Sequence, residues 1–413
     1  MQDNEKKPAL RFKGFTDPWE QRKLGDAFER VVRKNTNNES RLPLTISAQD
    51  GLVDQITYFN NRVASRDVSN YYLVYNGEFA YNKSTSDGYP FGAVKRLDWY
   101  EKGVLSTLYI VFALKHPEKD DSDFMTVFYD TDRWHRGVAE RAAEGARNHG
   151  LLNISADDFF DIDTTMPEDK VEQEKIGRLL KKLDTLITLH QRKYEKLVNI
   201  KKSMLDKMFP PNGASVPEIR FKGFTDPWEQ RKISELAEKT YGGGTPTTSN
   251  EAFWNGNIPW IQSSDIVDGK LMGVEPRKYI TQTGLNSSAT QLVPKDSIAI
   301  ITRVGVGKLA YMPFSYSTSQ DFLSLSKLNT EPFFTVYACY KKLQSELNTV
   351  QGTSIKGITK DELLAKTISV PVYSEQKQIG SFFIQLDTLI TLHQRKLEKL
   401  QNIKKSCLEK MFV

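Results

Sequence analysis

Hydrophobic residues recur at spacings of three and four along two long stretches of the chain, Glu172–Phe209 and Glu375–Phe412. No proline interrupts either stretch, and their only glycines, Gly177 and Gly380, lie near the starts. A sustained repeat of this kind predicts a helix with one apolar seam, as in a coiled coil. At a rise of 1.5 Å per residue, each helix could extend on the order of 55 Å. The predicted seam comprises Ile176, Leu180, Leu183, Ile187, His190, Tyr194 and Leu197 in the first helix, and Ile379, Phe383, Leu386, Ile390, His393, Leu397 and Leu400 in the second.

Two such helices in one chain would pack most simply on each other, antiparallel, and so form a stiff spacer. The other arrangement is an ordinary bundle in which each helix folds onto its own domain. The seam histidines, His190 and His393, are interpreted as packed, hydrogen-bonded side chains rather than metal ligands, because no cluster of carboxylates or cysteines accompanies them.

Outside these stretches, short alternating runs bounded by Gly, Asn, Asp and Ser predict β-strands. In the first half the predicted strands are Tyr71–Tyr75, Phe79–Asn82, Val104–Leu114 and Met125–Tyr129. In the second half they are Ile258–Gln262, Ser297–Thr302, Lys308–Pro313 and Phe322–Leu328, followed by helices at Phe333–Leu347 and Asp361–Leu364. Each half therefore predicts an α+β domain that leads into its long helix.

Two segments of the chain occur twice. Arg11–Lys23 and Arg220–Lys232 share the sequence RFKGFTDPWEQRK, and Leu183–Lys193 and Leu386–Lys396 share LDTLITLHQRK. The stretches at about 35–145 and 245–350 show no obvious similarity to each other. We infer that the repeated segments meet the same partner twice, whereas the divergent segments meet two different targets.

The repeats predict a pseudo-twofold molecule of α+β class, in which two long antiparallel coiled-coil helices join two globular domains and the chain ends lie near each other. The predicted boundaries are 1–170 for the first domain, 171–210 for the first helix, 211–372 for a linker and the second domain, and 373–413 for the second helix.

Composition adds little to this picture. The chain has 413 residues, of which 39% are hydrophobic and 26% charged, as is typical of soluble globular proteins. No apolar run approaches the roughly 18 residues that span a bilayer, and the polar N-terminus is unlike a secretory signal. We therefore expect a cytoplasmic protein with no membrane partner, whose two cysteines, Cys339 and Cys407, stay reduced.

Charge is unevenly distributed. Residues 1–171 hold 23 Lys and Arg against 28 Asp and Glu, whereas residues 172–210 hold ten against five and residues 375–413 hold seven against four. The positive excess thus lies on the two predicted helices. Such a run is typical of a solvated helix face, and also of a surface that contacts nucleic acid or an acidic partner.

Polar, glycine-containing loops carry the candidate chemistry. Those in the first half are Tyr81–Gly92 and Gly145–Gly150, and those in the second are Tyr241–Thr248, Gln262–Asp265, Thr302–Lys308, Ser317–Asp321 and Gly352–Gly357. Glycine lets backbone N–H groups approach phosphate, and Arg, Lys, Asn, Gln and Ser side chains discriminate bases. Any single loop is equally explained as a turn, but several in each domain favour a DNA-reading role.

Motifs for catalysis are missing. A phosphate-binding P-loop ending in Gly-Lys at Gly307–Lys308 would need glycine where Thr302 stands and Ser or Thr where Leu309 stands. The GGGTP run lacks the strand–GxGxxG–helix frame of a dinucleotide site. Five histidines without a paired signature do not support a Ser–His–Asp or zinc hydrolase. We therefore expect no catalytic residues, no metal and no cofactor in this chain.

These features resemble the specificity (S) subunit of type I restriction–modification enzymes over essentially the whole length. The resemblance rests on the two RFKGFTDPWEQRK segments and on PVYSEQKQI at Pro371–Ile379. Trp254–Ile266, Thr302–Ala310 and Tyr81–Arg96 also look like segments of target recognition domains. The first half departs from the pattern at Met166–Ile176, where acidic residues precede the helix.

The resemblance implies that each target recognition domain reads one half of a bipartite, asymmetric sequence in double-stranded DNA. The helices would set the spacer and dock two methyltransferase (M) subunits, and two restriction (R) subunits would complete the complex. S-adenosylmethionine, ATP and Mg would belong to those partners. Half-sites read from one face of DNA lie about one helical turn, roughly 34 Å, apart, a distance that a rigid coiled coil can hold.

The residues expected to contact DNA are Lys83, Ser84, Tyr89, Arg96, Arg147 and Asn148 in the first domain, and Thr245, Ser263, Ser264, Arg303, Lys308, Gln320 and Lys356 in the second. The alternative is a non-catalytic adaptor, whose variable domains bind proteins and whose coiled coil is only a tether.

Overall fold

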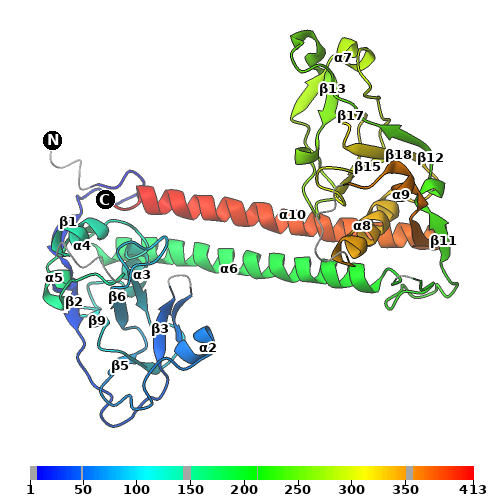
Figure 1. Ribbon diagram of the computed structural model, residues 1–413. Coiled ribbons are helices and arrows are strands. Elements are labelled where there is room, and N and C mark those ends of the chain that lie inside the picture. The colour runs from blue at the N-terminus through cyan, green and yellow to red at the C-terminus, as the bar shows by residue number, and fades with distance from the viewer. Residues whose placement is uncertain (1–6, 48–49, 143–149, 212, 350–356) are drawn as a thin grey trace. The chain divides into compact units, whose positions relative to one another are not determined.

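Figure 1 shows the computed structural model, which describes residues 7–47, 50–142, 150–211, 213–349 and 357–413. The chain forms two compact units: unit 1 consists of Met1–His190 and Lys396–Val413, and unit 2 of Gln191–Arg395. The long helices span Lys170–Lys207 (α6) and Tyr373–Lys410 (α10). Each unit therefore contains one variable domain and a part of each long helix.

The variable domain of unit 1 is built on a four-stranded antiparallel sheet in the order β2-β9-β6-β7. These strands are Phe28–Arg30, Ile110–Leu114, Phe79–Asn82 and Ala93–Arg96. Two further antiparallel pairs are β3 (Leu44–Ser47) with β4 (Gly51–Asp54), and β5 (Tyr72–Tyr75) with β8 (Lys102–Leu105). Aromatic rings from neighbouring strands fill the core: Phe28 meets Phe112 edge to face, with ring centroids 4.9 Å apart.

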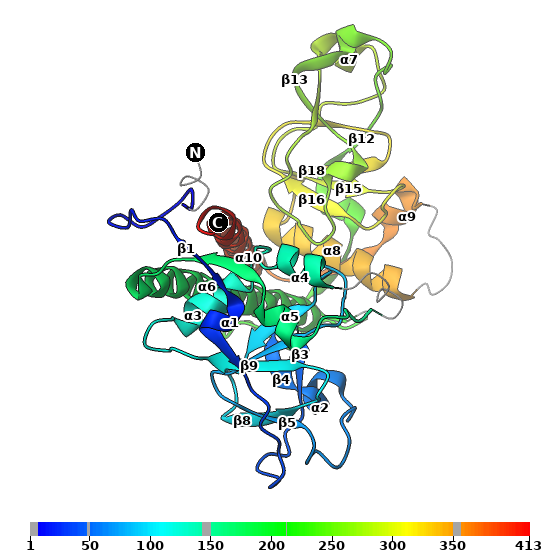
Figure 2. The same ribbon diagram turned by 90° about the vertical axis from the view of Figure 1, so that its left-hand side faces the viewer.

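Short helices in the described part of unit 1 lie mostly near the start of α6 (Figures 1 and 2). They are α1 (Leu24–Ala27), α2 (Gln55–Phe59), α3 (Ser122–Phe128), α4 (His135–Arg141) and α5 (Ala156–Phe160), of which α2 lies apart. The predicted strand at Met125–Tyr129 is wrong, because most of it lies in α3. Asp121 caps this helix by accepting a hydrogen bond from the Phe124 backbone N–H at 2.7 Å. Its buried residues have the spacing of a helix, but a short apolar run does not separate helix from strand in the sequence alone.

The predicted strand at Val104–Leu114 is two strands, β8 and β9. A turn in which the Tyr109 N–H donates to the Ser106 carbonyl at 3.2 Å separates them. The predictions at β5 and β6 are confirmed.

The variable domain of unit 2 contains a four-stranded antiparallel sheet in the order β12-β18-β15-β16, and a three-stranded sheet in the order β14-β13-β17. The first comprises Ala237–Gly242, Phe322–Leu328, Ser297–Ile301 and Leu309–Met312, and the second Lys278–Ile280, Trp254–Ile261 and Ser317–Thr318. The four strands predicted here are confirmed. Strand β15 is buried at all five positions because it lies between two neighbours.

Helices α7 (Gln282–Asn286), α8 (Pro332–Thr349) and α9 (Lys360–Ala365) complete unit 2, with single 3₁₀ turns at Ile233–Glu235, Glu251–Phe253 and Ser263–Asp265. The predicted helices at Phe333–Leu347 and Asp361–Leu364 are confirmed. Thr359 begins α9 with a capping box, in which its hydroxyl and the Glu362 carboxylate each accept the other residue's backbone N–H.

The two predicted long helices are confirmed, and every predicted seam residue is buried or half-buried. The buried ones are Ile176, Leu180, Leu183, Leu197, Ile379, Phe383, Leu386 and Leu397, and the half-buried ones are Ile187, His190, Tyr194, Ile390, His393 and Leu400. Within unit 1 the end of α10 packs on the start of α6, where Lys404 pairs with Asp184 at 2.6 Å. Within unit 2 the end of α6 packs on the start of α10, where Lys201 pairs with Asp387 at 2.6 Å. The predicted fold class, α+β domains with two long antiparallel helices, is confirmed.

The first and last described segments of the chain meet in unit 1, as predicted. The Leu10 N–H donates to the Lys410 carbonyl at 2.8 Å. In unit 2 the equivalent contact is made inside the chain, where the Ile219 N–H donates to the Lys207 carbonyl at 2.9 Å. The end of each long helix therefore binds the segment that leads into a repeated RFKGFTDPWEQRK sequence.

Within the described part of the chain, no helix combines the length and the apolar character that crossing a membrane requires.

Candidate nucleic-acid interface

In unit 1 the repeated segments fix the variable domain to the start of its long helix. Arg11 donates to both carboxylate oxygens of Glu172, at 2.6 and 2.8 Å, and to the Asp17 carbonyl. The Glu172 side chain is only 1% exposed, so this bidentate pair is made largely out of water. Gln173 accepts a hydrogen bond from the Asp121 N–H at 2.8 Å, and thereby ties the cap of α3 to the start of α6.

Unit 2 repeats the arrangement with equivalent residues. Arg220 donates to both oxygens of Glu375, at 2.7 and 2.8 Å, and to the Asp226 carbonyl. Gln376 accepts from the Glu331 N–H at 2.8 Å. Glu331 caps α8 as Asp121 caps α3. We call each arrangement a junction.

Two strand pairs complete the junctions. In unit 1, β1 (Glu20–Lys23) runs antiparallel to β10 (Asp163–Met166). In unit 2, β11 (Glu229–Lys232) runs antiparallel to β19 (Thr367–Val370). Each pair joins the repeated segment at the start of a domain to the strand just before its long helix.

The glycine in each helix start has a packing reason. A Cβ atom on Gly177 would lie 2.6 Å from the Phe124 nitrogen, and one on Gly380 would lie 2.9 Å from the Phe334 nitrogen. Only glycine lets the capped end of α3 or α8 approach the long helix so closely. The two junctions therefore hold two unrelated domains in the same way.

In unit 2, several of the predicted DNA-contacting residues meet. The Thr245 hydroxyl donates to the Gln320 amide oxygen at 2.6 Å, and both side chains are exposed. The Gly244 N–H donates to the Thr318 carbonyl at 2.8 Å. A Cβ atom on Gly243 would collide with the Ser319 carbonyl oxygen, so glycine is required for this close approach.

The turn that carries Ser263 and Ser264 joins the same place. The Ser319 N–H donates to the Ile261 carbonyl at 2.9 Å, so the end of β13 adjoins the segment that leads to Gln320. Ser263 is half-buried and Ser264 is exposed. The buried Asp265 fixes the turn by accepting from the Gln262 N–H and by pairing with Arg277 at 2.6 Å.

The Thr302–Lys308 loop begins beside the segment that carries Gln320. The Thr302 N–H donates to the Asp321 carbonyl at 2.7 Å, immediately after Gln320. Arg303 is exposed, and Lys308 is half-buried at the far end of the loop. The Ile358 N–H donates to the Thr302 carbonyl at 2.7 Å. The predicted contact residue Lys356 lies outside the described residues.

Together, Thr245, Ser263, Arg303 and Gln320 form what we call the unit 2 cluster. It combines hydroxyl, amide and guanidinium groups on four chain segments, which are the donors and acceptors that recognise base edges.

In unit 1, two of the predicted loops meet as well. The Thr85 N–H donates to the Gly150 carbonyl at 2.6 Å, and Ser84 forms an isolated bridge with Leu151. Lys83 donates its Nζ to the Ile154 carbonyl at 3.2 Å. Ser84 is exposed and Tyr89 is half-buried. Arg147 and Asn148 lie outside the described residues.

Arg96 is placed away from that loop contact. It lies in β7, where it pairs with Asp98 at 2.6 Å and Asp123 at 2.7 Å and donates to the Ser122 hydroxyl at 2.7 Å. These contacts brace the N-terminus of α3. Its guanidinium is therefore engaged within the protein, which favours a structural role over the predicted contact with DNA.

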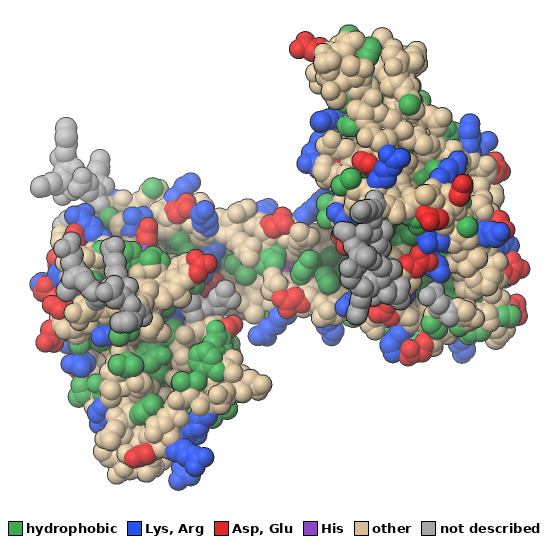
Figure 3. Space-filling model, in the orientation of Figure 1, with side chains coloured by type: hydrophobic (Ala, Val, Ile, Leu, Met, Phe, Trp, Pro, Cys, Tyr) green, Lys and Arg blue, Asp and Glu red, His purple; other side chains and the backbone are tan. Residues whose placement is uncertain are grey.

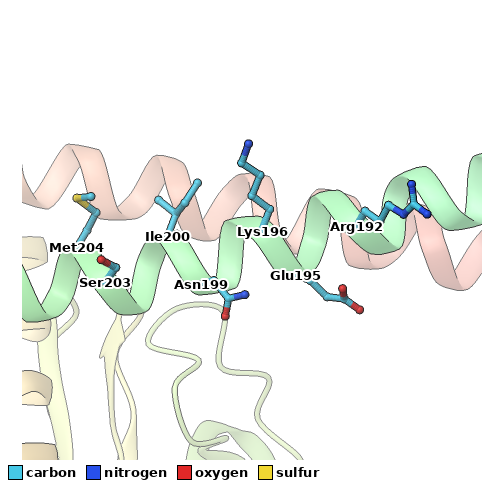
Figure 4. A pocket seen from close by; sticks show the side chains of 7 residues that line it. All are labelled: Arg192, Glu195, Lys196, Asn199, Ile200, Ser203 and Met204. Carbon is cyan, nitrogen blue, oxygen red and sulfur yellow. The ribbon is translucent and has the colours of Figure 1, made fainter. Parts of the chain in front are cut away.

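A third candidate surface runs along α6 in unit 2 (Figure 4). Arg192, Lys196, Ile200 and Met204, spaced by four residues, form one row, and Glu195, Asn199 and Ser203 form a second row beside it. Shifted by 203 positions, α10 carries the same residues, except that Cys407 replaces Met204. Neighbouring leucines are exposed in both copies, Leu189 by 56% and Leu392 by 45%. Because exposed positions are repeated as faithfully as seam positions, helix packing alone does not explain the repeat.

Comparisons with known proteins show what this chain is similar to. A model of the family described as "Type I restriction modification DNA specificity domain" matches residues 225–402. The type I restriction enzyme MjaIX specificity subunit of Methanocaldococcus jannaschii is 26% identical over 193 residues, which cover 45% of this chain and 44% of that relative. The putative MjaX specificity subunit of the same organism is 21% identical over 406 residues, or 94% of this chain and 91% of the relative.

Residues 225–402 therefore resemble this DNA specificity domain, and the chain is similar to type I restriction enzyme specificity subunits. It spans less than half the length of the first of these relatives. A crystal structure of the type I restriction–modification system S subunit from M. genitalium superimposes with a TM-score of 0.62 at 14% identity, covering 98% of this chain and 99% of that one. The likeness shows that the two chains share a fold.

Within the specificity-subunit fold, the described residues include no group of three or more His, Cys, Asp and Glu side chains that could hold a metal ion. Cys339 and Cys407 are free and buried.

Four acidic residues of the junctions escaped prediction. Glu172 and Glu375 occupy equivalent positions in the two helix sequences, and this equivalence is the signal that could have identified them. Asp121 and Glu331 lie in stretches without similarity, and only the fold brings them to equivalent places.

Proposed function

We propose that this chain is the DNA-specificity subunit of a type I restriction–modification complex and has no catalytic site of its own. Each variable domain reads one half of a bipartite, asymmetric target, and the long helices set the unspecified spacer between the halves. The observation that carries the proposal is the unit 2 cluster, which lies within the segment that the DNA specificity family covers.

The chemistry of the unit 2 cluster supports direct base reading. Arginine donates two parallel hydrogen bonds to guanine, and the amide of Gln320 can both donate to and accept from adenine. Thr245 already holds the Gln320 amide oxygen at 2.6 Å, which restricts its orientation before DNA arrives. Such preorganisation lowers the entropic cost of binding.

The repeated helix surface supports the partner part of the proposal. Two copies of one exposed surface suit two copies of one partner, and we assign them to two methyltransferase subunits. Two restriction subunits complete the complex. S-adenosylmethionine, ATP and Mg act in those subunits.

Salt dependence of DNA binding tests the proposal. The full chain with its methyltransferase partners should bind duplex DNA with an affinity that falls steeply as salt rises from about 50 to 200 mM, because phosphate contacts release counterions. A protein-binding adaptor would retain its partners after nuclease treatment and show little salt dependence. DNA binding that is absent, or flat with salt, would overturn the proposal.

A further inference from the structure

Three exposed arginines gather around one hollow in unit 1. The hollow has a volume of about 510 Å³, and its lining residues are Asn38, Arg41, Arg62, Arg66, Asp67 and Val68. This is the size of a small-ligand site, but such sites are mostly apolar. Here five of the six lining side chains are polar or charged, so the hollow suits a charged group.

The walls of the hollow are tied together by a buried side chain. Asn35 is 0% exposed, and its Nδ2 donates to the Ser40 carbonyl at 2.8 Å and to the Val68 carbonyl at 3.4 Å. The Ser40 N–H donates back to the Asn35 Oδ1 at 3.1 Å. One fully buried amide therefore joins the loop that carries Arg41 to the loop that carries Arg66.

The segment between Arg62 and Arg66 is fixed as well. Arg62 donates to the Ala64 and Ser65 carbonyls at 3.3 and 3.1 Å, which curls the segment around its guanidinium. The Ala64 N–H donates to the Gln55 side chain at 2.6 Å, so the segment is attached to α2.

The charge of the hollow is uncompensated. Three guanidinium groups face one carboxylate, that of Asp67. The Ser69 backbone and side chain hydrogen-bond to this carboxylate and lower its pKa, so it is ionised at neutral pH. The nearby Glu39 pairs with Lys102 at 3.6 Å instead. Across the described residues, no carboxylate forms an ion pair with any of the three arginines, so the hollow carries a net positive charge.

Helix α2 adds an apolar flank. Its Tyr58 and Phe59 are 49% and 50% exposed, and Val63 beside Arg62 is 66% exposed. Figure 3 shows hydrophobic side chains on the surface of unit 1 over α2. Nucleic acid presents phosphates next to apolar sugar and base surfaces, and a surface with arginines beside aromatic rings matches both.

We propose that this hollow binds a backbone phosphate of the DNA that unit 1 reads. The inference rests on the proposed function. Guanidinium forks bind phosphate oxygens bidentately, and phosphate contacts position a protein on the duplex without reading bases. The arginines thus hold unit 1 on DNA without reading its bases.

The test compares the full chain, in complex with its methyltransferase partners, with the triple variant R41A/R62A/R66A. Binding to a duplex of random sequence is measured from about 50 to 200 mM salt. We expect a drop in affinity of at least tenfold at the lowest salt, and a salt slope smaller by about one to two, because each lost phosphate contact removes about 0.9 from the slope. The preferred target sequence should not change.

A matched control removes the same charge elsewhere. R178A/R231A/K327A also loses three positive charges, but each of these side chains already pairs with a carboxylate. Its slope of log affinity against log salt should differ from the wild-type slope by less than about 0.9, which is the contribution of one phosphate contact. The unfolding temperatures of both triple variants show whether they fold. If R41A/R62A/R66A does not fold, the single variant R66E tests the site, because this one substitution should already weaken DNA binding.

The outcomes separate the two proposals. A wild-type chain without salt-dependent DNA binding overturns the proposed function itself. If wild type binds DNA, and R41A/R62A/R66A and R66E bind it with the same affinity and salt slope, only the proposal of the phosphate site is overturned. Inorganic phosphate provides the last comparison: if it raises the unfolding temperature of wild type but not of the triple variant, while DNA binding is unchanged, the hollow holds a free anion and the assignment to DNA is wrong.

Discussion

The two units use one junction to carry two different domains. Arg11 and Glu172 in unit 1 correspond to Arg220 and Glu375 in unit 2, and the bond lengths agree to within 0.1 Å. The domains they hold differ in strand order and in sequence. A constant frame with exchangeable readers is what a protein needs if its target changes while its partners stay the same.

The comparison also shows where the frame adapts. Lys404 in unit 1 and Lys201 in unit 2 are equivalent, and each pairs with the equivalent aspartate of the other long helix at 2.6 Å. The second partner differs: Lys404 also pairs with Asp130 at 3.3 Å, whereas Lys201 donates to the Gly269 carbonyl at 3.2 Å. The lysine at this position therefore donates to a different acceptor in each unit, which the attached domain supplies.

Breaking a junction should have the largest effect. Glu172→Ala leaves Arg11 without its buried partner and should lower the free energy of unfolding of unit 1 by about 3–5 kcal/mol, and Glu375→Ala should do the same to unit 2. Chemical unfolding followed by fluorescence measures both. The equivalence of the junctions would be refuted if one variant lost less than half as much stability as the other.

Replacing one arginine in each variable domain should separate an effect on DNA binding from an effect on stability. Arg303→Ala should weaken DNA binding by about 1–3 kcal/mol and relax one base position, if the arginine reads a guanine. Arg96→Ala should instead lower the stability of unit 1, because its charge pairs with Asp98 and Asp123 are lost. Binding isotherms and thermal unfolding of both variants are the measurements. If R96A binds DNA more weakly but is as stable as wild type, Arg96 contacts DNA and the structural role is wrong.

Substituting the glycine near the start of each long helix tests the junctions by the sign of the change in stability. Glycine to alanine inside a helix normally stabilises by about 1 kcal/mol. Gly177→Ala and Gly380→Ala should instead destabilise by about 1–3 kcal/mol, because the new Cβ meets the capped end of α3 or α8. Gly14, whose Cβ would meet nothing within 4 Å but whose φ is positive, gives a control in which backbone conformation acts without a clash. A gain in stability at both helix starts would show that the junctions are looser than described.

The smallest expected effect is the pH dependence of the contacts that Lys404 makes. Burial alone would lower the pKa of Lys404, but Asp130 and Asp184 raise it above its ordinary value of 10.5. This contribution to stability is complete below pH 10.5 and is lost as the pH rises through the raised value. The pKa of Asp130 is lowered by Lys95 and Lys404 despite burial, so its contribution is lost only below its ordinary value of 3.8.

Lys404→Met should therefore reduce stability most between about pH 4 and 10, and the difference from wild type should shrink at both extremes. Urea unfolding across the pH range measures this difference. A pH-independent difference would mean that the lysine acts through packing alone.

The repeated segments made much of the fold predictable from the sequence. The features that were not predicted depend on contacts between residues that are distant in the sequence. The long helices and their seams follow from a spacing that local sequence carries. The segment Met125–Tyr129 was assigned wrongly because α3 is short and begins at the Asp121 cap, outside the apolar run on which the prediction rested. In the candidate site, Thr245 and Gln320 were predicted separately, but their contact depends on glycines that let distant loops approach.

The arginine hollow was not predicted at all. Its residues lie on two loops, and the buried Asn35 that joins them has no sequence signature. Arg96 was predicted to contact DNA because its charge is visible in the sequence, whereas its partner Asp123 becomes adjacent only in the fold. The DNA-contacting residues remain predictions.

The central claim is that two divergent readers on one repeated frame each specify half of a DNA target. It is tested most directly by mapping methylated adenines in the genome of cells that express this chain with the methyltransferase subunits proposed as its partners. The account predicts a bipartite, asymmetric sequence with a fixed spacer, in which Arg303→Ala relaxes one half only. A single continuous target, or relaxation of both halves by that substitution, would contradict it.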